Sequence, residues 1–227
     1  MIQADTVVFK PLDSFTVDLK SLKLAQRRQR KETLREVYLD SQQYVYKRYI
    51  IKPRLPFYVK PWLNETHALM RANGLHAPVH LNLYKGINAE GNLEVVHQKK
   101  FIVGVALEII TAQHAEKLGR LLAELHKAGI VTRDPHKKNF FEDEGGNIYV
   151  VDMGKAHTHR FKSPLYIYNV GSEFAKLMHR TIEDKKVFWE VFIPTYFQHN
   201  RMPTAVKKMV MLCYYLCQFT RKKRRNL

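Results

Sequence analysis

The stretch that decides the fold reads LHKAGIVTRDPHKKNFFEDEGGNIYVVDMG and spans residues 125–154. A helical pattern ends near its start, and a polar loop that contains Asp134 and Asn139 follows. A Gly-Gly turn then leads into the apolar segment Ile148–Val151, and Asp152 comes directly after this predicted strand. Three oxygen-bearing side chains therefore stand on loops at the ends of one short hairpin, where we expect them to converge.

The chemistry of these three side chains suits phosphoryl transfer. Mg²⁺ is a hard cation that prefers oxygen ligands and usually binds one or two carboxylates together with substrate phosphates. We expect Asn139 and Asp152 to hold Mg²⁺, and Asp134 to accept the proton of an attacking hydroxyl. Phosphoryl transfer asks little more of a protein than this positioning and charge neutralisation. ATP is the expected phosphoryl donor.

The same residues resemble two motifs of protein kinases. Arg133 and Asp134, followed after four residues by Asn139, resemble the kinase catalytic loop, and the DMG sequence that begins at Asp152 resembles the Asp-Phe-Gly motif. An isolated Asp-x₄-Asn pattern is weak. Its position between an amphipathic helix and an apolar strand that ends in Asp-x-Gly makes the resemblance specific.

This resemblance implies two further site residues upstream. Kinases carry a lysine on the third strand that contacts the nucleotide phosphates, and a glutamate on the following helix that fixes it. The segment YVYK, which ends at Lys47, resembles that strand, and Glu65 lies in the next predicted helix. Lys52, Lys60 and Glu36 are the competing candidates for these two positions.

The amino-acid sequence of the loop argues against a protein substrate. Histidine stands two residues after Asp134, where protein kinases usually place lysine, and no long segment with an Ala-Pro-Glu anchor follows Asp152. Over residues 118–155, and more loosely over 44–79, the chain resembles the bacterial lipopolysaccharide core kinases, especially the heptose kinase family. The resemblance implies ATP-dependent phosphorylation of a sugar of the lipopolysaccharide inner core, a heptose, at the cytoplasmic face of the inner membrane. Kinases acting on protein Ser/Thr or a small metabolite, and a non-catalytic scaffold of the same fold, are the alternatives.

Two departures from the kinase pattern concern the loop and the phosphates. Thr132 stands where the family has histidine, and we expect altered packing there rather than lost chemistry. Residues 26–30, QRRQR, stand where a glycine-rich loop is expected. These arginines could replace backbone amides through charge-assisted hydrogen bonds, contact the acceptor or membrane, or form a solvated loop. His136 and Lys137, beside the base, are candidates for contacts to the γ-phosphate or to acceptor phosphates.

The apolar pattern outside the site predicts an α+β protein. The predicted strands are 34–39, 44–51, 80–84 and 93–105, and the predicted helices are 61–73 and 111–128. The pattern after residue 157 is mainly helical. We expect a two-lobed, protein-kinase-like fold, with a small β-rich N-lobe over residues 1–105 and a mostly helical C-lobe over residues 106–227.

The charge of the chain bears on its partners. The 227 residues carry a formal net charge of +17, which attracts polyanions. A lipopolysaccharide core glycolipid on an anionic inner-membrane surface fits this charge. The aromatic residues do not interleave with basic ones in an RNA-binding motif, so no nucleic-acid partner is expected.

The C-terminal segment has two interpretations. Apolar residues 209–219 precede the basic run RKKRR at 221–225, which predicts either attachment to an anionic leaflet or a core helix with a solvated tail. No apolar run reaches the length of a membrane span, and no secretory signal is evident. The resemblance to the lipopolysaccharide core kinases implies a cytoplasmic protein that is peripheral on the inner membrane. Cys213 and Cys217, one helical turn apart, are expected to be buried free thiols.

Overall fold

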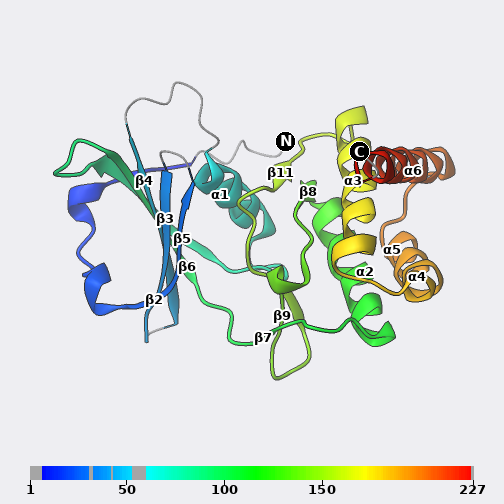
Figure 1. Ribbon diagram of the computed structural model, residues 1–227, viewed down its shortest axis with the longest axis horizontal. Coiled ribbons are helices and arrows are strands. Elements are labelled where there is room, and N and C mark those ends of the chain that lie inside the picture. Colours follow the sequence, from blue (N-terminus) through cyan, green and yellow to red (C-terminus); the bar gives the residue numbers. More distant parts are fainter. Residues whose placement is uncertain (1–6, 31–32, 42, 53–59, 226–227) are drawn as a thin grey trace.

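The computed structural model describes residues 7–30, 33–41, 43–52 and 60–225, with a β-rich N-terminal part and a helical C-terminal part (Figure 1). Six strands form one sheet in the order β1-β5-β6-β4-β3-β2. The strands are β1 (Lys10–Pro11), β2 (Lys23–Arg30), β3 (Thr33–Leu39), β4 (Tyr44–Ile51), β5 (His80–Ile87) and β6 (Leu93–Lys100). Strand β1 is parallel to β5, and the other neighbouring strands are antiparallel.

Most elements of this part follow the sequence-based prediction. The predicted hairpin is formed by β3 and β4, and the predicted helix is α1 (Pro61–Ala72), which ends in a left-handed Asn73. The strand predicted over 93–105 was too long. Strand β6 ends at Lys100 because the chain leaves the sheet there and enters β7 (Val105–Ala106), which pairs with β9 (Phe140–Glu142).

The basic run at residues 26–30 is a strand and not a loop. These residues belong to β2, which pairs with β3 after a register shift between Leu24 and Gln26. Residues 31–32, which join the two strands, lie outside the described residues. The expectation of a loop at 26–30 was wrong because pairing along β3 extends the backbone. In a strand the charged side chains alternate between the two faces of the sheet.

Both faces of the sheet are covered by other parts of the chain. One face packs on α1 through a cluster formed by Tyr49, Ile51, Trp62, Leu83 and Val95. The other face carries Tyr38, Tyr46 and Val96, which pack against the N-terminal segment that contains the 3₁₀ turns η1 (Leu12–Ser14) and η2 (Leu19–Ser21). Polar side chains on the α1 face, here called the inner face, therefore point between the sheet and the remainder of the protein.

The C-terminal part is built on helices. They are α2 (Ala112–Lys127), α3 (Pro164–Arg180), α4 (Lys185–Val187), the π-helical turn η4 (Phe188–Phe192), α5 (Ile193–His199) and α6 (Thr204–Arg225). Several short elements of this part lie between its helices and the N-terminal sheet (Figure 1). They include the strands β8 (Ile130–Val131), β10 (Ile148–Val150) and β11 (His157–Thr158) and the 3₁₀ turn η3 (Lys137–Asn139).

Local sequence explains where α2 begins and ends before the loop that contains Asp134 and Asn139. The Thr111 side chain accepts a hydrogen bond from the His114 N–H and so caps the first turn. Four leucines at helical spacing, Leu118, Leu121, Leu122 and Leu125, are buried in the core. Gly129 then adopts a φ of +75°, and a Cβ there would approach the His159 carbonyl oxygen to 2.3 Å. Only glycine fits this turn, so the helix ends where the sequence predicts.

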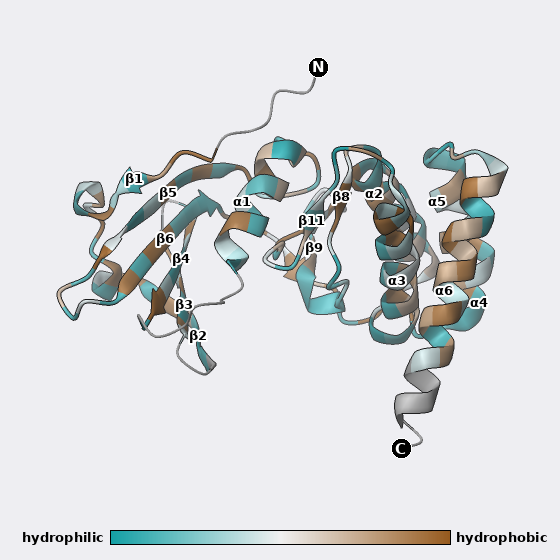
Figure 2. Ribbon diagram, turned by 90° about the horizontal axis from the view of Figure 1, so that it is seen from above, coloured by the Kyte–Doolittle hydropathy of each residue, from teal (hydrophilic) through white to brown (hydrophobic). Residues whose placement is uncertain are grey.

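Helix α6 is half core and half surface. Its inner side contributes Val210, Tyr214 and Cys217 to the core, and it crosses α3 at Gly171, where a Cβ would come within 2.6 Å of Cys213. Both cysteines are free, although Cys213 is only half-buried. The outer side of α6 remains apolar and exposed (Figure 2).

Candidate active site

A buried carboxylate behind the loop, Glu173 on α3, holds the segment that carries Asp134. Its Oε1 accepts hydrogen bonds from the backbone N–H of Arg133, at 2.8 Å, and from the hydroxyl of Thr132. Its Oε2 lies 2.6 Å from Nε2 of His126. Thr132, which replaces the histidine of the kinase pattern, therefore anchors the loop through its hydroxyl.

The backbone of this loop is strained at Arg133. Its φ of 60° is left-handed, a conformation that costs a non-glycine residue of order 1–3 kcal/mol. The bond to Glu173 and a 2.6 Å bond from Lys176 Nζ to the Arg133 carbonyl hold that conformation. Burial raises the pKa of Glu173, but the hydrogen bonds from its partners outweigh burial and lower it. An ionised acceptor thus fixes the residue that precedes Asp134.

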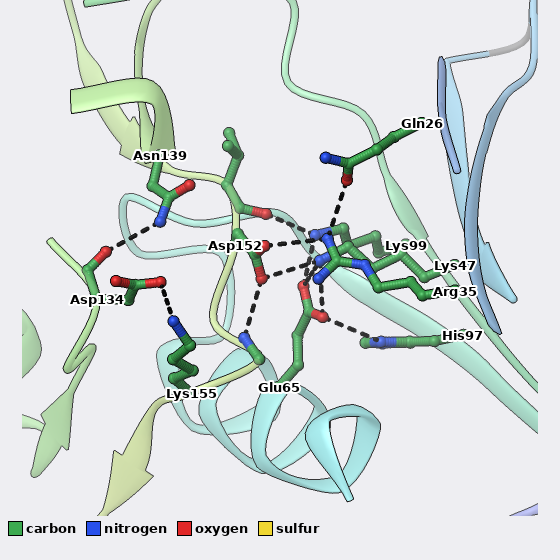
Figure 3. A network of polar contacts seen from close by, with 12 residues as sticks. Gln26, Arg35, Lys47, Glu65, His97, Lys99, Asp134, Asn139, Asp152 and Lys155 are labelled. Atoms are coloured by element: carbon green, nitrogen blue, oxygen red, sulfur yellow. Dashed lines mark hydrogen bonds and ion pairs between the residues drawn. The ribbon is translucent and has the colours of Figure 1, made fainter. Parts of the chain in front are cut away.

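Asp134 and Asn139 meet through the backbone of the loop. The Asn139 side-chain nitrogen donates to the Asp134 carbonyl at 2.9 Å, and the N–H of Val151 donates to the Asn139 carbonyl at 2.9 Å. The Asp134 carboxylate is 26% exposed. Lys155 Nζ lies 2.6 Å from one of its oxygens and an Arg180 Nη lies 3.4 Å from the other (Figure 3 shows Lys155). The carboxylate is accessible and has two cations beside it.

Asp152 is contacted by two cationic side chains of the sheet. Lys47 Nζ lies 3.2 Å from its Oδ1, and an Arg35 Nη donates to its Oδ2 at 3.2 Å (Figure 3). The N–H of Gly154 also donates to Oδ1, at 3.1 Å. Burial raises the pKa of Asp152, yet Lys47 and Arg35 outweigh burial and hold the pKa well below its usual range.

Glu65 on α1 is fully buried and binds two lysines of the inner face. Lys47 Nζ lies 2.8 Å from both carboxylate oxygens, and Lys99 Nζ lies 2.7 Å from Oε1. Lys99 also donates to the Val151 carbonyl at 2.6 Å, directly before Asp152. Burial raises the pKa of Glu65, but the two lysines lower it to about 2. The helix, the sheet and the strand before Asp152 are therefore joined at one point.

The two lysines respond differently to this environment. Burial lowers the pKa of Lys47, but Asp152 and Glu65 outweigh burial and raise it above its usual range. Lys99 has the weaker compensation, and burial lowers its pKa to about 8. His97 between them is also buried, and burial lowers its pKa to about 3, so it is neutral at physiological pH.

The structure brings five of the predicted site residues together and leaves two aside. Lys47, Glu65 and Asp152 form one group, and Asp134 and Asn139 form a second group beside it (Figure 3). The ring of His136 accepts from the N–H of Lys138 at 3.2 Å, and Lys137 Nζ binds Glu183 at 3.1 Å. Neither side-chain contact joins these two residues to the others, and His136 meets Asp134 and Asn139 only through backbone hydrogen bonds of 2.8 and 2.7 Å.

Sequence reasoning did not include Arg35 and Lys99. No local sequence signal identified Lys99: it lies two residues from His97, and only the fold shows that His97 pairs with Lys47 across the sheet. Arg35 pairs with Tyr49, which is itself two residues from Lys47. Side chains of paired residues share a face, so both point to the site. The competing candidate Glu36 lies on the opposite face and binds Arg48 and Arg27.

The donor set beside the loop fits a hard cation. The Asn139 nitrogen is used by the Asp134 carbonyl, which leaves the amide oxygen as a ligand atom, and Asp152 offers a carboxylate. One carboxylate and one amide oxygen match the protein share of a Mg²⁺ shell that nucleotide phosphates and water complete. Within the described ranges, no group of three or more His, Cys, Asp or Glu side chains forms a metal cage of its own.

Comparisons with known proteins bear on the fold. No protein-family model matches the sequence, and no curated protein is detectably similar to it. Among solved structures, a co-crystal structure of WbdD and a kinase inhibitor is similar over 86% of this chain and 45% of that chain, with a TM-score of 0.52 and 19% sequence identity. The chain thus spans less than half the length of that neighbour. The likeness shows a kinase-like α+β fold with a β-rich N-terminal sheet and a helical C-terminal part.

Proposed function

We propose that the protein is an ATP-dependent kinase that phosphorylates a sugar hydroxyl, that of a heptose, in the lipopolysaccharide inner core. The observation that carries the catalytic part is the contact of Lys47 with both Glu65 and Asp152, at 2.8 and 3.2 Å. Asn139 is linked to this group by the N–H of Val151, the residue before Asp152, which donates to the Asn139 carbonyl. The Asn139 side chain in turn donates to the Asp134 carbonyl. The kinase-like fold supports this assignment.

Each residue has a role in the proposed reaction. Asp134 orients the acceptor hydroxyl and accepts its proton. The hydroxyl oxygen bonds to the γ-phosphorus of ATP while the bond from that phosphorus to the β,γ-bridging oxygen breaks, and ADP leaves. Lys47, fixed by Glu65, contacts the α- and β-phosphates. Asn139 and Asp152 would hold Mg²⁺, which when bound neutralises phosphate charge.

The charges around Asp134 support an acceptor with anionic groups. Lys155 and Arg180, which contact its carboxylate, have side chains 66% and 52% exposed. Exposed ion pairs contribute about 0–1 kcal/mol, so an incoming anion can draw these cations away from the carboxylate. A core sugar that carries phosphate or carboxylate groups would supply that anion and would leave Asp134 next to the acceptor hydroxyl.

The outer side of α6 supports attachment of the protein to the anionic inner-membrane surface from the cytoplasm. Its exposed apolar side chains are Met209, Leu212, Tyr215, Leu216 and Phe219. Their spacing of three or four residues places them along one side of the helix, as a stripe here called the α6 stripe. The sequence RKKRR at 221–225 follows it, and each basic residue near an anionic surface contributes about 1 kcal/mol. Across the described part of the chain, we find no helix with the length and hydropathy needed to span a bilayer.

Transfer of label from ATP tests the proposal. The purified protein is incubated with γ-labelled ATP, Mg²⁺ and core glycolipid from cells that lack the gene, and labelled sugars are identified by mass spectrometry. We expect label on a core heptose, and we expect Asp134→Asn to lower the rate by about 10²–10⁴-fold. Asp13→Asn, an exposed aspartate of η1, is the matched control and should retain wild-type activity.

The rival functions give different outcomes in the same assay. Label on protein serine or threonine, or on a small metabolite, with none on glycolipid would assign a different acceptor. A scaffold without catalysis would show no turnover, and Asp134→Asn would leave the cellular phenotype intact. The pairing of both Asp152 oxygens with side-chain cations, Arg35 and Lys47, is the feature that favours this scaffold.

A further inference from the structure

Two arginines lie side by side on the inner face of the β2–β3 hairpin. Arg28 on β2 pairs in register with Arg35 on β3, and Arg35 pairs in turn with Tyr49 on β4. Because directly paired residues of antiparallel strands project to the same side, both arginines share the face of Lys47. Gln26, on the same face, accepts from Arg35 at 3.4 Å and points with it toward Asp152 (Figure 3).

This arrangement has a cost that contacts within the hairpin do not offset. Like charges directly opposite each other across two strands are destabilising. The single acid of β2 and β3 is Glu36, which lies on the other face and serves Arg27 and Arg48. Arg28 is exposed, and within the described residues the Nε of Arg35 is buried without a hydrogen-bond partner. The inner face therefore has positive charge, and at Arg35 Nε a hydrogen-bond donor, without a matching anionic acceptor among the described residues.

The charge balance of the network beneath the hairpin points the same way. Three cations, from Arg35, Lys47 and Lys99, contact two carboxylates, from Glu65 and Asp152. Arg28 adds a further positive charge beside Arg35 and adds no acid. An anion with several oxygens placed between the hairpin and Lys47 would balance the excess. Phosphate groups suit this position, because a guanidinium binds two phosphate oxygens through parallel N–H bonds.

We propose that Arg28 and Arg35 bind the phosphates of the nucleotide and perform the task of the glycine-rich loop that the chain lacks. This inference rests on the proposed function. Arg35 exchanges the Asp152 carboxylate for a phosphate oxygen when the nucleotide enters. Asp152 Oδ2 is then released, and the charge of the phosphates replaces that of the carboxylate beside Arg35. Side-chain donors thus act where other kinases use backbone amides.

Binding of a non-hydrolysable nucleotide tests this inference without turnover. Isothermal titration measures the affinity of wild type, Arg28→Gln and Arg35→Gln for the ATP analogue AMP-PNP with Mg²⁺, and for adenosine at millimolar concentration. Arg27→Gln is the matched control, because Arg27 is next in sequence but lies on the opposite face with Glu36. We expect each inner-face variant to bind AMP-PNP about tenfold more weakly, as for loss of one charge-assisted bond, with adenosine affinity unchanged.

The outcomes separate this inference from the proposed function. If wild type binds AMP-PNP and both inner-face variants bind it equally well, the inference is overturned and the proposed function stands. Equal weakening of AMP-PNP and adenosine also overturns it, because that pattern reports a damaged cleft. If wild type binds no nucleotide, both fall. Arg28→Gln keeps the test decisive even if Arg35→Gln fails to fold, since the Arg28 side chain is exposed.

Discussion

Substitution of Glu65 by glutamine would probe the point where the two parts of the protein meet. Glu65 is fully buried, and it binds Lys47 through both oxygens at 2.8 Å and Lys99 at 2.7 Å. Glutamine keeps the shape but removes the negative charge, and its amide nitrogen turns one acceptor into a donor that faces a lysine. Two buried ammonium groups would then lose their shared counter-charge.

The magnitude follows from the pKa of this carboxyl group. The lysines lower it from 4.5 to about 2, and each pKa unit corresponds to about 1.4 kcal/mol, so ionised Glu65 contributes roughly 3 kcal/mol to the free energy of unfolding. Removal of one partner from a buried ion pair typically costs about 3–5 kcal/mol. The two figures agree, and we expect Glu65→Gln to lose about 3–5 kcal/mol at pH 7.

The pH dependence has a definite sign. The folded-state pKa of Glu65 lies below its value in the unfolded chain, so its contribution is fully present above about pH 5 and is lost as the pH falls toward 2. The unfolding free energies of wild type and Glu65→Gln should therefore differ most near neutral pH. Their difference should shrink as the pH is lowered from 5 to about 2.

Urea unfolding followed by circular dichroism measures this difference at each pH. Glu116→Gln is the matched control: Glu116 forms an exposed i,i+4 pair with Arg120, which contributes only about 0.3–0.5 kcal/mol. A loss below 1 kcal/mol for Glu65→Gln, or a loss that is the same at pH 7 and pH 3, would refute the reasoning. The same variant should bind AMP-PNP more weakly, because Lys47 loses the partner that positions it.

Three further predictions follow from the described contacts. Lys99 has a pKa of about 8 in the folded protein and 10.5 in the unfolded chain, so its charged form opposes folding below pH 8 and this effect is gone above pH 10.5. Between these two pH values, the unfolding free energy of wild type should therefore rise by roughly 3 kcal/mol relative to that of Lys99→Met. Urea titrations at each pH measure this difference. Thr132→Ala leaves a buried carboxylate oxygen with one donor fewer and should cost about 1–3 kcal/mol, with a parallel fall in phosphoryl-transfer rate as the loop loosens. The double variant Leu212→Glu/Phe219→Glu should abolish co-sedimentation with phosphatidylglycerol vesicles, whereas Ile87→Glu, an equally exposed apolar position on the sheet, should not; unchanged co-sedimentation of the double variant would remove the α6 stripe as a membrane contact.

The sequence determined the elements around the loop because their signals are local. A capped leucine-rich helix, a left-handed glycine and a Gly-Gly turn each act within a few residues, and they place Asp134, Asn139 and Asp152 on one hairpin. These three residues lie near one another because the chain that joins the first to the last is only about twenty residues long. The kinase-like fold predicted from them is the fold observed.

Tertiary structure alone decided which charged residues of the sheet face this hairpin. Arg35 reaches Asp152 across 117 positions of sequence, and Lys99 meets Glu65 across 34. Local pattern does not distinguish Arg35 from its neighbour Glu36, because a strand alternates its side chains between two faces and a register shift of one residue exchanges them. The register of β2, β3 and β4 put Arg28 and Arg35 on the inner face, and it put Glu36 outside. Strand pairing, which depends on residues distant in sequence, therefore decided the electrostatics of the site that local motifs had located.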